Sequence, residues 1–265
     1  MVQWLVLRQE PASGAWNMSL DAALLEAAER DGLAALRLYA WDPPTLSFGR
    51  NEPALRRYDR AAIAARGLAV VRRPTGGRAV WHHREVTYAV AAPVATFGSL
   101  RDSYHEIHAM LAAALRELGA DVRLAADRPA TGVGAGACFA SAAGGEVMAA
   151  RNGGGGGGGG GKVVGSAQVR GTRAFLQHGS VLLRAEQEVV AAVTVGEGGE
   201  PRATGLAELL PAGAATWGAV SAAIHRTAAA RWGAPAVPGE LPAELRRAAE
   251  ALVPRYADPA WTWRR

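Results

Sequence analysis

The chain has 265 residues, with 29 Lys and Arg against 24 Asp and Glu, so its net charge is +5 at pH 7. This length fits one large or two small domains, and 49% apolar with 20% charged residues is ordinary for a soluble globular protein. No apolar run reaches the roughly 18 residues that a membrane span needs, and the N-terminus lacks the pattern of a secretory signal. We therefore expect a cytoplasmic protein without a membrane partner.

The positive charge suits an anionic partner, such as nucleic acid, an acidic carrier protein or a phosphorylated substrate. The Arg-rich, Ala- and Gly-rich composition of a GC-rich genome explains the charge equally well. Because no basic run with interleaved aromatic residues is present, we do not expect a nucleic-acid partner.

The single cysteine, Cys138, excludes an internal disulfide framework and any cysteine-rich zinc or iron–sulfur site. The six histidines are scattered, apart from His82–His83 and the pair His105 and His108. We expect no metal site. A lone intracellular cysteine is either a small buried apolar residue or a nucleophile, and only its context distinguishes the two.

Strand-like and helix-like segments are interspersed in the first half of the chain. We expect a strand at 2–7, a helix capped by Asn17 or Ser19 and ended by Gly32, a half-buried strand at 36–41, extended chain at 45–49, a helix at 59–66, and strands at 68–73 and 79–91.

The clearest helix follows, because four apolar residues lie on one face and a glycine ends it: Ile107, Leu111, Leu115 and Leu118, then Gly119. Strands are expected at 146–150, 162–169 and 175–183. Beyond Gly205 the chain reads as mainly helical, with Val220, Ile224 and Ala228 on one stripe and a final helix at about 243–256. We find no internal repeat.

Nine consecutive glycines, Gly153 to Gly161, stand between two strand-like segments. Such a run cannot pack, and we interpret it as a flexible, lengthened hairpin connection. No Gly-Lys-Ser/Thr sequence follows it, so it does not match a phosphate-binding P-loop.

The segment 72–82 (RRPTGGRAVWH) joins two expected strands and combines glycines with arginines. Paired glycines let the backbone approach a ligand closely, and an arginine can orient an anionic or carbonyl group. The same residues also suit a plain Pro/Gly turn with solvated arginines. Residue types alone leave both interpretations open.

Two later segments have the same ambiguity. In 162–168 (KVVGSAQ), Lys162 begins an apolar strand. If its ammonium group is partly desolvated, it can stabilise an oxyanion or a thiolate. If it is exposed at the strand end, it has no such role. In 176–180 (LQHGS), His178 lies between a strand and small residues, which suits a structural histidine better than direct acid–base chemistry.

Together, in this order and spacing, RRPTGGRAVWH, GKVVGSAQ and LQHGS resemble the lipoate/octanoate branch of the biotin–lipoate protein ligase family. The resemblance begins at 17–21 (NMSLD), includes 37–47 (RLYAWDPPTLS) and extends to 256–261 (YADPAW). It implies an α+β fold, with a central, mainly antiparallel sheet flanked by helices and a smaller second sheet. It also implies a single catalytic domain over 1–265, with a flexible polyglycine loop at 153–161 and a helical part from about 205 to 265.

Within this family, the stretch 137–142 (ACFASA) looks like the acyl-accepting cysteine of one octanoyltransferase subfamily, and Gly76-Gly77-Arg78 also resembles that subfamily. The subfamily moves octanoate from octanoyl-acyl carrier protein to a lysine of a lipoyl domain, typically the glycine cleavage H protein. The resemblance implies Cys138 as the nucleophile that carries the thioester, and Lys162 as the cation that favours its thiolate. No metal, ATP or other cofactor is expected, because the donor thioester is already activated, and we expect a monomer.

The resemblance also implies a group of residues that bind the substrate: Arg73, Thr75, Gly76, Gly77, His82, Gly165, Ser166, Gln168, His178 and Gly179. An apolar channel for the eight-carbon chain is expected to use Val80, Tyr88 and Val164.

The chain departs from the family pattern at two places. The family usually has His-Asp where this chain has His82-His83, so an acidic group is missing at that position. The polyglycine run enlarges the connection between the Cys138 segment and Lys162, and the strands on either side must still pair if those two residues are to meet.

Three alternatives remain open. An ATP-dependent lipoate–protein ligase would use Lys162 to hold an acyl-adenylate and would not need Cys138, although a chain ending at Arg265 leaves little room for the accessory domain of many such ligases. An enzyme that moves octanoate between lipoyl domains belongs to the same reaction class. A non-catalytic acyl- or carrier-binding protein is the alternative outside enzymes. Biotin ligation is not favoured, because the Gly-Arg-Gly-rich motif of biotin ligases is missing.

Overall fold

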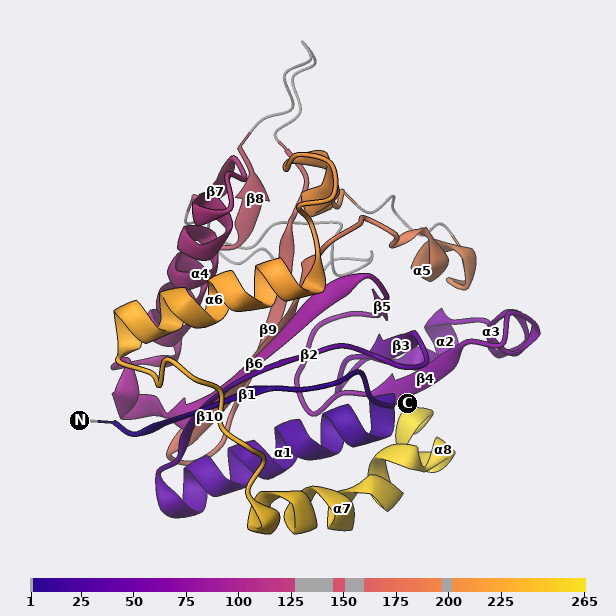
Figure 1. Cartoon of the computed structure of the whole chain (residues 1–265). Helices are drawn as coiled ribbons and strands as arrows, with labels where there is room; N and C mark the ends of the chain where they lie inside the picture. Colours follow the sequence, from indigo (N-terminus) through magenta and orange to yellow (C-terminus); the bar gives the residue numbers. More distant parts are fainter. Residues whose placement is uncertain (1, 127–144, 151–159, 197–201) are drawn as a thin grey trace.

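A computed structural model of the chain describes residues 2–126, 145–150, 160–196 and 202–265. A five-stranded sheet crosses the middle of the molecule (Figure 1), with the strand order β1-β2-β6-β10-β9. β1 and β2 are parallel, and the other neighbours are antiparallel. The strands are β1 (Trp4–Arg8), β2 (Ala34–Tyr39), β6 (Glu85–Pro93), β9 (Val164–Arg170) and β10 (Ala174–Leu182).

A second sheet has the order β4-β3-β5, and a two-stranded ribbon pairs β7 with β8. These strands are β3 (Thr45–Phe48), β4 (Ala69–Arg72), β5 (Val80–His82), β7 (Val122–Leu124) and β8 (Val147–Ala149). The predicted α+β fold, with a mainly antiparallel central sheet and a smaller second sheet, is confirmed.

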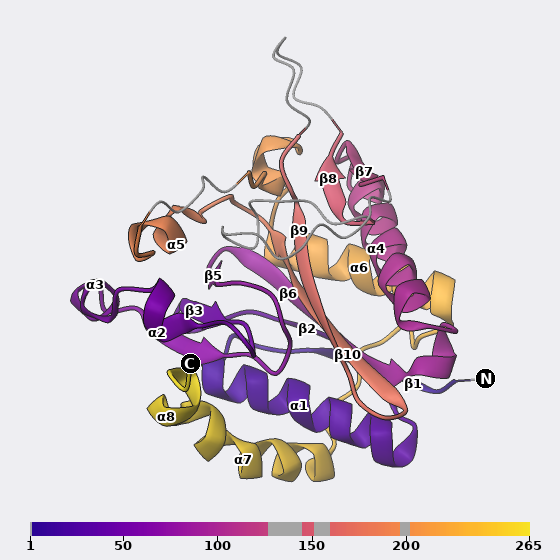
Figure 2. The same ribbon diagram turned by 180° about the vertical axis from the view of Figure 1, so that it is seen from behind.

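Helices cover both faces of the central sheet (Figures 1 and 2). α1 (Gly14–Asp31) and α7 (Ala243–Ala257) lie side by side on one face, and α4 (Leu100–Glu117) and α6 (Trp217–Trp232) lie on the other. The shorter helices are α2 (Ala54–Arg57), α3 (Arg60–Ala65), η1 (Val94–Thr96), α5 (Glu188–Ala192), η2 (Leu206–Glu208) and α8 (Pro259–Thr262). In the described ranges, no helix has the length and apolar character to cross a bilayer.

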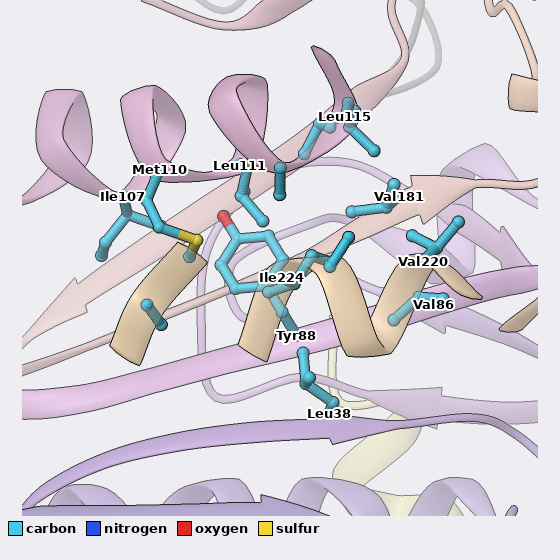
Figure 3. Close-up of a cluster of buried hydrophobic side chains, with 14 of the residues drawn as sticks. Leu38, Val86, Tyr88, Ile107, Met110, Leu111, Leu115, Val181, Val220 and Ile224 are labelled. Atoms are coloured by element: carbon cyan, nitrogen blue, oxygen red, sulfur yellow. The ribbon is translucent and has the colours of Figure 1, made fainter. Parts of the chain in front are cut away.

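Each face of the sheet has its own hydrophobic core. Leu36 and Leu38 pack towards α4 and α6, whereas Ala35 and Tyr39, on alternate positions of the same strand, pack towards α1 and α7. Figure 3 shows Leu38 and other sheet residues beneath side chains of α4 and α6. All six residues of β2 are therefore buried, and the expectation of a half-buried strand at 36–41 is wrong, because helices cover both faces.

The helix with the clearest apolar spacing lies where we expected it. Ile107, Leu111 and Leu115 are fully buried in the core on the α4 side, and Leu118 packs against that core. Gly119, at φ +94°, follows the helix in the left-handed conformation that favours glycine.

Two predicted boundaries are wrong. The first helix begins at Gly14 because the Ser13 hydroxyl caps it by accepting the N–H of Trp16; Asn17 and Ser19 lie inside the helix. The expected strand at 79–91 is broken after His82, because β5 belongs to the small sheet and β6 to the central sheet. Arg84 makes the turn between them with φ +46°.

The two sides of the polyglycine insertion pair with each other. Met148 and Lys162 form an antiparallel bridge, with the Ala149 N–H donating to Gly161 O at 3.0 Å and the Val163 N–H donating to Val147 O at 3.0 Å. Glycines 153–159 lie outside the described residues. The insertion therefore leaves intact the pairing that brings the Lys162 segment beside β8.

Candidate active site

Lys162 and Glu146 form a buried ion pair just before β9. The Lys162 Nζ lies 2.9 Å from both Glu146 carboxylate oxygens, and the two residues are 2% and 4% exposed. The Tyr104 hydroxyl lies 3.5 Å from the same carboxylate. The structure thus places the predicted catalytic lysine inside the protein, where a charge acts in a low dielectric and its electrostatic effect on a nearby group is large.

Cys138 lies outside the described residues, as does the whole stretch 127–144. The described chain resumes at Gly145, and Glu146 follows Cys138 by eight residues in the sequence. The role of Cys138 as the nucleophile therefore stays a prediction.

A narrow pocket of about 20 Å³ opens between the start of β9, the middle of β10 and β5. Six of the predicted substrate-binding residues line it: Arg73, His82, Gly165, Ser166, His178 and Gly179. The rest of the wall comes from Tyr39, Trp41, Val80, Thr87, Ala167 and Ser180.

Behind the pocket, Asp21, His178 and Thr75 form a linear network. The His178 Nδ1 lies 2.9 Å from the Asp21 carboxylate, so it carries the hydrogen, and the Thr75 hydroxyl donates to Nε2 at 2.6 Å. Arg37 and Tyr39 donate to the same carboxylate at 2.7 and 2.8 Å. The order hydroxyl–imidazole–carboxylate matches a nucleophilic triad, but Thr75 is 0% exposed and cannot reach a substrate. The network instead fixes to β10 the loop between β4 and β5 that contains Gly76 and Gly77, called the glycine loop below.

The charges of this network are settled by its surroundings. Burial alone would raise the pKa of Asp21, but the Arg37 guanidinium and the hydrogen bonds from His178 and Tyr39 bring that pKa below its ordinary value. Burial lowers the pKa of His178 and outweighs the effect of Asp21. At neutral pH the network therefore holds an ionised Asp21 and a neutral His178.

Arg73 holds the glycine loop in place. Its guanidinium donates to Ser47 O at 2.9 Å, to Ser47 Oγ at 2.6 Å, and to Gly76 O and Arg78 O at 3.0 and 2.8 Å. These four bonds tie the two ends of the loop to β3. Arg73 also lines the pocket, so its predicted contact with the substrate stays a prediction.

His82 forms the floor of the pocket together with Trp41. The two rings stack with centroids 4.0 Å apart. The His82 Nε2 lies 2.6 Å from Ser47 Oγ, and Nδ1 lies 2.8 Å from the Glu85 carboxylate. Both ring nitrogens are therefore engaged by groups of the protein, and His82 lines the pocket.

The departure at His83 has a local compensation. The His83 Nδ1 lies 2.6 Å from the Glu186 carboxylate, which comes from the segment after β10, and Arg84 also pairs with Glu186 at 3.2 Å. An acidic group thus stands beside position 83, although the sequence supplies it from a hundred residues away.

Two glycines are required by close backbone approach. A Cβ on Gly49 would lie 1.9 Å from Gly77 O, and a Cβ on Gly179 would lie 2.4 Å from Gly165 O and 2.6 Å from Ser166 Oγ. Gly49 thus sets the position of the glycine loop, and Gly179 lets β10 approach the pocket side of β9.

Four expected residues do not line the pocket. Thr75 lies behind His178, and Gly76 and Gly77 lie in the loop that Arg73 holds. The Gln168 amide points away, to Leu100 O at 3.2 Å. Of the expected channel residues, Val80 lines the pocket, whereas Tyr88 and Val164 belong to the core under α4 and α6.

Comparison with known proteins places the chain. The model of the lipoyl protein ligase A/B catalytic domain matches residues 13–218. The chain belongs to this family. A curated member from Kyrpidia tusciae, named Octanoyltransferase LipM, is 37% identical over the full length of both chains. Another of the same name, from Moorella thermoacetica, is 40% identical over 68% of this chain and 65% of its own length.

Solved structures of lipoyl protein ligases have the same fold. The crystal structure of lipoate-protein ligase A bound with ATP superposes with a TM-score of 0.80 at 17% identity, over 99% of both chains. Protein Ta0514 from T. acidophilum, a putative lipoate protein ligase with bound lipoic acid, gives a TM-score of 0.76 at 18% identity, over 99% of both chains. At this level of identity the likeness shows the fold of the family.

Three residues of this lipoyl protein ligase-family chain were not identified as site residues from the sequence. Asp21 stood in a quoted motif without a role, Glu146 only marked the start of a strand, and His108 was noted only for its closeness to His105. Each acts through a partner distant in the sequence: His178, Lys162 and Ser166. In the part of the chain that the structure describes, no group of three or more His, Cys, Asp or Glu is placed to hold a metal ion.

Proposed function

We propose that this chain is an octanoyltransferase of lipoate biosynthesis, which moves octanoyl from octanoyl-acyl carrier protein to a lysine of a lipoyl domain, such as the glycine cleavage H protein, through a thioester on Cys138. The full-length identity to curated octanoyltransferases supports octanoyl transfer. The donor, the acceptor and the roles of Cys138 and Lys162 rest on the sequence motifs and the geometry of the site.

The reaction has two steps. The Cys138 thiolate attacks the donor carbonyl, the new carbon–sulfur bond forms, and the carrier thiol leaves with a proton. An acceptor lysine amine then attacks the enzyme thioester, the carbon–nitrogen bond forms, the Cys138 sulfur leaves, and the nitrogen releases a proton. A free thiol has a pKa of about 8.5, and a neighbouring cation increases the thiolate fraction.

The observation that carries the proposal is the buried ion pair of Lys162 and Glu146. In the sequence, Lys162 comes three residues before Gly165, which lines the narrow pocket. A lysine held by a carboxylate inside the protein supplies a fixed positive charge without exposing it to bulk water. Each methylene of the acyl chain that becomes buried on binding contributes up to about 0.8 kcal/mol.

A cluster of arginines near the C-terminus supports an acidic donor protein. Arg264 donates to Arg50 O at 2.7 Å, and the Trp261 ring lies between Arg255 and Arg264, whose guanidinium carbons are 3.9 and 3.8 Å from its centroid. All of these arginines are exposed, and so is Arg265. Burial and the neighbouring arginines lower the pKa of Arg264, which reports their mutual repulsion.

This arginine surface (Arg50, Arg255, Arg264 and Arg265) joins the glycine loop directly. The Arg50 N–H donates to Thr75 O at 2.7 Å, and Thr75 in turn contacts His178 behind the pocket. Among the residues with described positions, no salt bridge neutralises the four side chains. The positive charge of this surface would attract an acidic carrier protein to the side of the molecule where the glycine loop lies.

The ATP-dependent ligase is the competing function, because the ligases share the fold. The test is transfer of octanoyl from octanoyl-acyl carrier protein to an apo lipoyl domain, with and without ATP, by wild type and by Cys138→Ala. We expect ATP-independent transfer that Cys138→Ala abolishes. Modification that needs ATP and free octanoate, and that survives in Cys138→Ala, would establish a ligase instead.

A further inference from the structure

Five polar side chains line the narrow pocket between β5, β9 and β10: Tyr39, His82, Thr87, His178 and Ser180. The strand register places Tyr39, Thr87 and Ser180 side by side on three neighbouring strands, on the face of the central sheet opposite α4 and α6. Each of the five carries a hydrogen that a ligand oxygen can accept. Where these hydrogens go therefore decides what the pocket can bind.

Three of the five hydrogens go to one oxygen of Glu85. Its Oε1 lies 2.8 Å from His82 Nδ1 and 2.9 Å from Ser180 Oγ. The Thr87 hydroxyl donates to the same oxygen. Since an indole N–H only donates, Thr87 accepts from Trp41 at 2.7 Å and keeps its own hydrogen for Glu85. One carboxylate oxygen thus gathers three neighbouring groups of the pocket wall.

The other two hydrogens go to Asp21. Its carboxylate accepts from the Tyr39 hydroxyl at 2.8 Å and from His178 Nδ1 at 2.9 Å. The remaining nitrogens of both pocket imidazoles lie 2.6 Å from hydroxyls of the protein. Asp21 is 0% exposed and Glu85 is 3% exposed, and neither is among the described residues that line the pocket. Both carboxylates therefore act from behind the wall.

The pocket withholds these five donors from a ligand. Arg73, which also lines it, gives four hydrogen bonds to oxygens of the protein. A pocket of about 20 Å³ has room for about one water molecule, so a ligand oxygen that enters leaves its own water behind. It gains none of the five hydrogens in exchange, which weakens binding by about 10- to 100-fold, whereas a methylene needs no partner.

We propose that Glu85 and Asp21 are positioning residues that make this pocket selective for an unsubstituted alkyl chain, because they hold the hydrogens of the wall away from the ligand. This inference rests on the proposed function, in which the ligand is an octanoyl group. Glu85 is the better residue to test, since Asp21 also pairs with Arg37 at 2.7 Å. Without Glu85, the hydroxyl hydrogens of Ser180 and Thr87 turn about their C–O bonds and reach a ligand oxygen.

The test is a competition between two donors in one tube. Octanoyl-acyl carrier protein is mixed with an equal amount of a donor whose chain has an ether oxygen in place of one methylene, near the middle or near the end. An apo lipoyl domain is added, and mass spectrometry gives the ratio of the two products, which does not depend on how much enzyme is folded. We expect wild type to favour octanoyl about 10- to 100-fold over at least one ether donor, and Glu85→Leu to lower that preference at least about fivefold.

Three further variants complete the test. Glu85→Gln keeps a carbonyl oxygen at the position of Oε1 and should keep the wild-type preference within about twofold. Glu186→Leu is the matched control, because it removes the carboxylate 2.6 Å from Nδ1 of His83, the residue after His82, outside this pocket; it should leave the preference unchanged. Val80→Thr adds a hydroxyl of the same shape to the pocket wall and should lower the preference at least about threefold.

Equal transfer of octanoyl and both ether donors by wild type would overturn the inference, as would an unchanged preference in Glu85→Leu or a loss as large in Glu186→Leu. If Glu85→Leu yields no product, an unchanged preference in Val80→Thr overturns it. Failure of wild type to transfer any octanoyl is a different result, since it refutes the proposed function. Calorimetry with octanoic acid and the matching ether acids then tests the pocket by itself, and equal dissociation constants in wild type overturn the inference.

Discussion

Replacing Glu146 with leucine removes the carboxylate that lies 2.9 Å from the buried Lys162 ammonium. Removing one partner of a buried ion pair costs about 3–5 kcal/mol, because the remaining charge has lost its compensation and cannot return to water. Both groups are at least 95% buried in this structure, so the upper half of that range applies if the site cannot open.

In a chain of this size, a loss of 3–5 kcal/mol lowers Tm by about 6–20 °C. The double variant Glu146→Leu with Lys162→Met removes both charges and keeps most of the buried volume. Replacing a whole buried pair by apolar groups is often neutral, so the double variant should recover most of the stability that either single variant loses.

The assay is urea unfolding of wild type, both single variants and the double variant, followed by tryptophan fluorescence. The control is Arg226→Ala, which breaks an exposed pair with Glu117 and should cost at most about 1 kcal/mol. Single variants as stable as the Arg226→Ala control, or a double variant that loses the sum of both single effects, would refute the reasoning.

Three further predictions follow from particular contacts. Gly49→Ala should lower the free energy of unfolding in urea by about 1–3 kcal/mol or more, because its Cβ would lie 1.9 Å from Gly77 O. Gly76→Ala, whose Cβ would have nothing within 4 Å, should lie within about 0.5 kcal/mol of wild type, and equal losses would contradict this account of the loop. Because folding lowers the pKa of His108 to about 4, the free energy of unfolding of wild type should be highest above about pH 6.5 and fall by up to about 3 kcal/mol towards pH 4. His108→Gln should lack this fall, and parallel pH curves for the two proteins would show that His108 is not buried in its neutral form. The double variant Arg50→Glu with Arg264→Glu should raise KM for octanoyl-acyl carrier protein about tenfold with little change in kcat. Arg170→Glu, exposed at the far end of β9, should leave KM unchanged. An unchanged KM in the double variant would show that the arginine surface does not bind the donor.

Much of the fold follows from local pattern, and the failures have physical causes. The spacing of Ile107, Leu111 and Leu115 fixes one face of α4 without reference to the rest of the chain. The alternation in β2 suggested a solvent-facing side at Arg37, yet Arg37 is buried, because Asp21 on α1 pairs with it at 2.7 Å. The alternation of apolar and polar residues along a strand cannot reveal that a helix on the second face supplies a buried counter-ion, here Asp21.

The site divides in the same way. Gly179 is recognisable because close backbone approach demands glycine there, and Gly77 because its φ of +85° favours glycine. Glu146 and His108 are not recognisable in this way, because no short motif marks either residue. Each has a partner that only the folded chain brings close: Lys162, across the polyglycine insertion, for Glu146, and Ser166, fifty-eight residues away, for His108.

Intact-protein mass spectrometry after mixing the enzyme with octanoyl-acyl carrier protein, without ATP, addresses the cysteine mechanism itself. We predict one octanoyl adduct on wild type that hydroxylamine removes and that Cys138→Ala does not form. An adduct that persists in Cys138→Ala, or that resists hydroxylamine, would contradict a thioester on Cys138.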